Sequence, residues 1–97
     1  MALTVVFRPE ASAEVLETKS WYDGRASGLG NRFIDDLEAL LARVVERPVS
    51  FPTVRDQTRR AVLRRFPYAV YFRQNDNQIV VLAVHGRQDP KRWQSRA

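Results

Sequence analysis

The 97-residue sequence contains no cysteine and only one histidine, and these two scarcities exclude several classes of functional site. Without cysteine there is no disulfide scaffold, no thiolate zinc site and no cysteine nucleophile. A single histidine, His85, also excludes a histidine-rich metal centre, and we expect neither a metal ion nor another cofactor. No apolar run approaches the roughly 18 residues that a membrane-spanning helix requires, so we expect no membrane partner.

The N-terminal residues show neither a basic leader nor a long apolar segment followed by a cleavage site, which predicts a cytoplasmic protein. Hydrophobic residues make up 44% of the sequence and charged residues 28%. This composition and length predict one globular domain over residues 1–97. A chain of this size buries roughly 60 to 70% of its extended surface on folding, which is enough for one modest core.

The net charge of +5 is distributed unevenly along the chain. Residues 1–49 carry six basic and eight acidic side chains, a net of −2, whereas residues 50–97 carry ten basic and three acidic ones, a net of +7. Five arginines crowd into eleven residues, namely Arg55, Arg59, Arg60, Arg64 and Arg65. They repel one another unless an anionic group lies nearby, so they predict a docking surface for phosphate or an acidic protein segment. The alternative is edge-strand charge that discourages aggregation.

Hydrophobic periodicity divides the chain into a helical first half and a strand-rich second half. The pattern predicts strands at Leu3–Phe7, Arg60–Phe66, Tyr68–Arg73 and Gln78–His85, and helices at about Pro9–Tyr22 and Leu29–Glu46. The intervening Val49–Thr58 is predicted to be a loop, and Asn75 to Asn77 a hairpin turn. The order β-α-α-β-β-β predicts an α+β fold in which a helical hairpin packs on one face of a small antiparallel sheet. The other face and the sheet edges would remain for a partner.

Two groups of charged side chains lie on these predicted elements. In the strand expected at Arg60–Phe66, alternation would place Arg60 and Arg64 on one face, with Arg59 and Arg65 on the other. On the second helix, three acids are expected to form a solvated surface: Asp35, Asp36 and Glu38.

The end of the last strand and the tail beyond it carry residues suited to RNA cleavage. His85 would move a proton, Arg87 and Lys91 would stabilise a pentacoordinate phosphate, and Trp93 would stack on a base. The alternatives are that His85 is structural and that Trp93 is a lid over the core.

Several short motifs together resemble the RelE/ParE superfamily of toxins from bacterial type II toxin–antitoxin systems. The resemblance covers nearly the whole chain and rests on PEA after the first strand, WYD at the end of the first helix, and above all the strings RRFPYAVYFR and VVLAVHGRQDPKRW. It implies a RelE/ParE-like fold and a small basic toxin. It also implies a cognate antitoxin whose acidic segment wraps the toxin and holds it inactive. The toxin and the antitoxin could assemble into a higher-order oligomer.

The two branches of the superfamily differ in activity, and the residues favour one of them. RelE-like members cut messenger RNA on the ribosome with an arginine just after the tyrosine that opens the third strand, a second arginine after the last strand, and a tyrosine or histidine near the C-terminus. Here Tyr68 is followed by Ala69, Arg87 matches the second arginine, and Trp93, which cannot supply a proton as a tyrosine could, occupies the aromatic position. His85 is the remaining substitute.

The pattern from Phe66 to Phe72 resembles the ParE-like branch, whose members poison DNA gyrase by binding it and lack the nuclease residues. The resemblance therefore predicts a gyrase inhibitor without an enzymatic centre of its own. Its partner-binding residues would be Arg59, Arg60, Arg64, Arg65, Arg87 and Trp93. The alternatives are a RelE-like endoribonuclease, with the ribosome and its mRNA as partners, and a degenerate module that keeps the fold without toxicity.

The charge split and the free sheet surface also suggest how the antitoxin binds. We expect an acidic amphipathic segment to bury apolar surface against the helical hairpin or the sheet. Its carboxylates would contact Arg64, Arg65 or Arg87, where a hydrogen bond between charged groups contributes roughly 1.5 to 3 kcal/mol.

Overall fold

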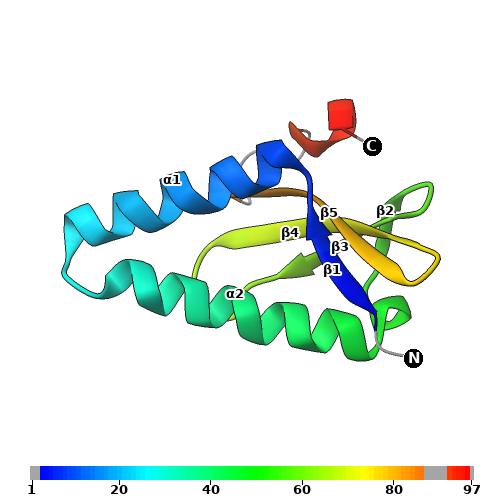
Figure 1. The fold of residues 1–97 in the computed structure, drawn as a ribbon, viewed down its shortest axis with the longest axis horizontal. Helices are drawn as coiled ribbons and strands as arrows, with labels where there is room; N and C mark the ends of the chain where they lie inside the picture. Colours follow the sequence, from blue (N-terminus) through cyan, green and yellow to red (C-terminus); the bar gives the residue numbers. More distant parts are fainter. Residues whose placement is uncertain (1–2, 87–91, 97) are drawn as a thin grey trace.

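Two helices pack against one face of a five-stranded sheet in the computed structural model, which describes residues 3–86 and 92–96 (Figure 1). The elements are β1 (Thr4–Phe7), α1 (Pro9–Arg25), α2 (Leu29–Glu46), the 3₁₀ turn η1 (Pro48–Ser50), β2 (Thr53–Arg55), β3 (Thr58–Val62), β4 (Tyr68–Asn75), β5 (Gln78–Gly86) and the 3₁₀ turn η2 (Arg92–Arg96). The strand order across the sheet is β1-β5-β4-β3-β2. The predicted α+β class and the helical hairpin are confirmed.

The helices begin where the sequence indicates, and one of them ends later. Pro9 opens α1 because its missing N–H lies in the first turn, where the helix has no acceptor for it. We expected α1 to end at Tyr22, but it continues through Asp23 and Gly24 to Arg25. The break comes instead at Gly28, whose φ of +82° lies in the left-handed region that favours glycine. The predicted range of α2 is confirmed.

The sheet is mixed, not wholly antiparallel as expected, because β1 pairs with β5 in parallel. Thr4 lies opposite Gln78 and Phe7 opposite Val81. The pairs β2 with β3, β3 with β4 and β4 with β5 are antiparallel. Hydrophobic alternation shows which face of a strand is buried, but it carries no information about direction relative to a partner far along the chain.

The segment between α2 and β4 differs most from expectation. The expected loop Val49–Thr58 contains β2, whose three exposed residues give no hydrophobic alternation. The strand expected at Arg60–Phe66 lies at Thr58–Val62 instead. The chain then turns, with the Leu63 N–H donating to the Tyr68 carbonyl at 3.0 Å. Arg64 and Arg65 therefore lie in a turn, so they do not share strand faces with Arg60 and Arg59.

The main core lies between the helices and the sheet, and α2 contributes most of its helical side. Its buried apolar residues follow helical spacing: Phe33, Leu37, Leu40 and Val44. They pack against side chains of β3, β4 and β5, and each fully buried side chain of this size contributes roughly 1.5 to 3 kcal/mol. In α1 only Ala11 and Glu14 are buried. The other apolar residues of α1 are therefore left at least partly accessible.

We had expected the opposite face of the sheet to remain open for a partner. Instead, η2 covers part of it. Trp93 of η2 is buried with Ala69, Tyr71 and Ala83 in a second apolar cluster. An ion pair between Arg96 and Glu14 of α1 connects η2 to the helical layer.

Candidate partner-binding surfaces

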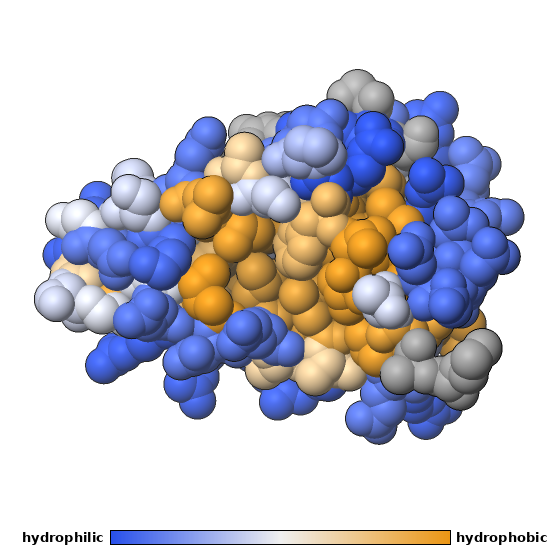
Figure 2. Space-filling model, in the orientation of Figure 1, coloured by the Kyte–Doolittle hydropathy of each residue, from blue (hydrophilic) through white to orange (hydrophobic). Residues whose placement is uncertain are grey.

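An apolar groove lies where α1 crosses β1, and it is the first surface suited to a partner. Phe7, Ser12, Val15 and Leu16 line it, with a volume of about 310 Å³. Leu16 is 67% exposed and the adjacent Val15 is half-buried, so the apolar wall of the groove is open to a partner. Hydrophobic residues gather between α1 and α2 on this side of the molecule (Figure 2). We call the four lining residues the apolar groove.

The groove adjoins an unpaired strand edge. Because β1 is the terminal strand of the described sheet, its outer backbone groups face no further strand. Such an edge accepts an extended peptide by adding its backbone hydrogen bonds to the sheet. The groove and the edge of β1 together can bind a segment that is both extended and apolar.

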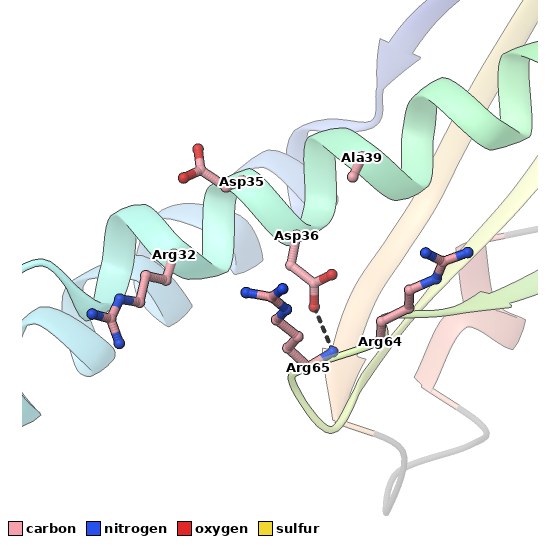
Figure 3. A pocket seen from close by; sticks show the side chains of 6 residues that line it. All are labelled: Arg32, Asp35, Asp36, Ala39, Arg64 and Arg65. Carbon is pink, nitrogen blue, oxygen red and sulfur yellow. Dashed lines mark hydrogen bonds between the residues drawn. The ribbon is translucent and has the colours of Figure 1, made fainter.

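A second hollow lies between α2 and the turn that joins β3 to β4 (Figure 3). Its volume is about 240 Å³. We call it the arginine pocket; the residues that line it are Arg32, Asp35, Asp36, Ala39, Arg64 and Arg65. Asp36 is only 8% exposed, and its Oδ2 accepts the backbone N–H of Arg65 at 2.9 Å. In Figure 3 the side chains of Arg64 and Arg65 extend to either side of Asp36.

Of the described arginines predicted to bind a partner, only Arg64 and Arg65 line the same pocket. Arg59 Nη1 donates to the carbonyl oxygens of Phe51 at 2.6 Å and Val49 at 3.4 Å, so this side chain stabilises the loop after α2. Arg60 lies opposite Tyr71 in the β3–β4 pair, and its Nε is buried without a partner among the described residues. Arg59, Arg60 and the pair Arg64 and Arg65 therefore lie in three separate environments.

The residues predicted for RNA cleavage are buried where the structure describes them. His85 and Trp93 are each 2% exposed, and both rings stack with Tyr71, at centroid distances of 4.9 and 5.4 Å. His85 Nδ1 lies 3.0 Å from the Gly86 carbonyl oxygen. Trp93 thus packs over Tyr71 on this face of the sheet, and both His85 and Trp93 are closed off from solvent in the structure. Arg87 and Lys91 lie outside the described residues.

Helical spacing identifies two buried acids that our interpretation of the sequence missed. Asp36, expected on a solvated surface, lies three residues after Phe33 and four before Leu40, within the buried stripe of α2. Glu14 lies three residues after the buried Ala11 in α1. Each carboxylate accepts a backbone N–H from the sheet half of the chain: Asp36 from Arg65 and Glu14 from Val84. The pattern that identifies both buried acids in the sequence is an acidic residue three or four positions from the buried apolar residues of its helix.

The helical hairpin is closed by a further carboxylate with a shifted pKa. Hydrogen bonds from the Lys19 ammonium and the Gly30 backbone N–H lower the pKa of Asp23 below its ordinary value of 3.8. Near it, burial and the neighbouring Tyr68 raise the pKa of Tyr22 above 10.0. The Tyr22 ring also contacts Phe66 with centroids 4.8 Å apart, which connects α1 to the turn that forms the arginine pocket.

Comparison with known proteins gives one family and a common fold. A family model described as the ParE toxin of the type II toxin–antitoxin system ParDE matches residues 5–90. No curated protein matches the chain significantly. Within the described residues, no helix combines the length and hydropathy needed to cross a bilayer.

Two solved structures resemble this one. The chromosomal ParDE toxin–antitoxin system of P. aeruginosa is 15% identical, with a TM-score of 0.75 over 87% of this chain and 95% of that chain. The toxin–antitoxin complex RelBE2 of Mycobacterium tuberculosis is 19% identical, with a TM-score of 0.64 over 90% of this chain and 100% of that chain. At these identities the likeness establishes the fold alone.

Proposed function

This chain belongs to the ParE toxin family of type II toxin–antitoxin systems, and from that premise we propose that it binds and inhibits DNA gyrase until a cognate antitoxin neutralises it. The burial of His85 and Trp93 against Tyr71 is the observation that favours a toxin acting by binding over a nuclease. General acid–base chemistry requires a titratable group within hydrogen-bond reach of the substrate, and the described surface presents no histidine. The site of action would be the cytoplasm.

Induction in a bacterial host tests the choice of target. We expect growth arrest with loss of supercoiling and a DNA-damage response, while messenger RNA stays intact. Codon-linked cuts in mRNA with gyrase activity untouched would refute the proposal and support the RelE-like alternative, and those cuts should then disappear in His85→Ala. Absence of growth arrest would identify a non-toxic module.

The apolar groove supports the antitoxin part of the proposal. Covering the exposed 67% of Leu16 would contribute roughly 1 to 2 kcal/mol to the binding free energy, and β1 offers backbone hydrogen bonds beside it. We therefore place the apolar side of the antitoxin segment in the groove and against the edge of β1.

Two matched substitutions test this placement. Leu16→Glu and Val49→Glu each introduce one charge at a residue that is about equally exposed, 67% and 69%, but only Leu16 lines the groove. Both variants should fold and arrest growth, because exposed substitutions usually change stability by less than about 0.5 kcal/mol. We expect the product of the neighbouring open reading frame to rescue Val49→Glu fully and to bind Leu16→Glu at least roughly tenfold more weakly. Equal rescue of the two would contradict the placement.

A further inference from the structure

We propose that the arginine pocket binds one carboxylate side chain, an aspartate or glutamate of the antitoxin segment. The pocket's own geometry favours a carboxylate ligand. Only the identity of the partner that carries the carboxylate rests on the proposed function.

The turn that presents Arg64 and Arg65 is fixed on both sides. Before it, Leu63 is buried and its N–H bonds to the Tyr68 carbonyl. Within it, the Arg65 N–H donates to Asp36 Oδ2 at 2.9 Å. After it, Phe66 packs edge to face against Phe33, with centroids 5.6 Å apart. The backbone of both arginines is therefore placed before a ligand arrives, which lowers the entropic cost of binding.

The guanidinium groups of this pocket have no acidic partner in the described part of the chain. By contrast, Lys19 pairs with Asp23 at 3.1 Å and Arg96 pairs with Glu14 at 2.8 Å, so these two cations already have an acidic partner. Arg32, Arg64 and Arg65 make no such pair there. Of the two carboxylates that line the pocket, Asp36 has an oxygen committed to the backbone N–H of Arg65, and Asp35 makes no ion pair with these arginines in the described structure. A guanidinium presents paired N–H donors that match the two oxygens of a carboxylate.

The acids around the pocket favour an isolated carboxylate over a nucleic-acid backbone. Asp35 and Asp36 line the pocket, and Glu38 is exposed on the same helix. A duplex carries one negative charge about every 1.7 Å of its axis, so a phosphate that entered would bring others toward these acids within a Debye length of about 10 Å. A single glutamate brings one charge and is small enough for a hollow of about 240 Å³.

The test is a titration of the purified toxin with a capped alanine peptide that carries one glutamate, at low ionic strength, followed by the side-chain Nε–H signals of arginine in NMR spectra. The matched variants are the double substitution R64Q/R65Q and, as a control, R47Q, which removes an exposed arginine outside the pocket. We expect saturable shifts at Arg64 and Arg65, at least a tenfold loss of affinity in R64Q/R65Q, and less than a twofold change in R47Q. A hexathymidylate oligonucleotide should bind at this pocket more weakly than the single-glutamate peptide.

Three results would overturn the proposal: shifts spread equally over all exposed arginines, no shift at Arg64 and Arg65, or tighter binding of the oligonucleotide in the pocket. None of these needs gyrase or an antitoxin, so failure here leaves the growth and supercoiling assays standing. Conversely, if the single-glutamate peptide binds as expected and the neighbouring gene product fails to rescue growth, the carboxylate site stands and the proposed partner is wrong.

Discussion

Replacing Glu14 with alanine should destabilise the fold strongly although the residue lies on a helix. Its Oε1 accepts the Val84 N–H at 3.0 Å and an Arg96 Nη1 hydrogen at 2.8 Å. The pairing of β5 with β1 stops at Val81, because β1 ends at Phe7. Past that point Glu14 supplies an acceptor that a neighbouring strand would otherwise provide, and it also retains η2.

The magnitude follows from what the substitution leaves behind. Each hydrogen bond to the carboxylate contributes roughly 1.5 to 3 kcal/mol, and breaking a buried ion pair costs about 3 to 5 kcal/mol. The side chains of Arg96 and Glu14 are 16% and 10% exposed, so solvent recovers part of this cost. We expect Glu14→Ala to lower the free energy of unfolding by about 3 kcal/mol, which corresponds to a fall in Tm of roughly 12 to 24 °C for a domain of this size.

Urea unfolding of Glu14→Ala, Glu14→Gln and Arg96→Gln measures the effect. Glu14→Gln keeps an acceptor for the Val84 N–H and loses only the charge, so its loss should be about half that of Glu14→Ala. The double variant E14Q/R96Q should cost less than the sum of its single substitutions, because the two side chains contact each other. A Glu14→Ala protein within about 0.5 kcal/mol of the parent would refute the reasoning, since that is the response of an ordinary surface residue.

Further predictions concern backbone, burial and pH. Gly30→Ala should lose about 1 to 3 kcal/mol, because its Cβ would lie 2.6 Å from the Lys19 carbonyl oxygen, whereas Gly24→Ala, with open space around it, should gain about 0.5 to 1 kcal/mol; urea unfolding compares them. Tyr71→Phe removes a buried hydroxyl without a partner among the described residues, so stability should stay equal or rise by about 1 kcal/mol, and a loss of that size would reveal a partner. The stabilisation from Asp23, whose pKa is lowered, should be fully present above pH 3.8 and lost as the pH falls through the lowered pKa; a carboxyl NMR titration with its midpoint at or above 3.8 would contradict this.

Local signals were sufficient for most elements of the fold. The range of α2 follows from an apolar stripe interrupted by glycine at one end and Pro48 at the other. The hairpin of β4 and β5 follows from strand patterns around a polar turn, in which Asp76 takes a φ of +55°. Pro9 similarly set the start of α1. In each case the determinant lies within a few residues of the feature it fixes.

The failures have a different origin, because the features concerned leave no local hydrophobic pattern. The direction of β1 relative to β5 is decided by the number of turns between them. β2 is exposed throughout and is held by pairing with β3, so its residues carry no strand signal. The five clustered arginines predicted a docking surface. Instead, Arg59 of β3 bonds to loop carbonyls, Arg60 of β3 lies opposite Tyr71, and Arg64 lines a pocket, a division that depends on where β3 ends.

The two proposed antitoxin contacts lie on different parts of the helical layer, and this arrangement bears on how neutralisation works. The apolar groove is formed by α1 and β1, while the arginine pocket is formed by α2 and the β3–β4 turn. A segment that fills both must extend across the hairpin, so its two contacts are joined and the second binding step is intramolecular. Moderate affinities at each site then combine into tight inhibition. A loss at either site should weaken binding steeply without affecting the fold, because Leu16 and Arg64 are both exposed.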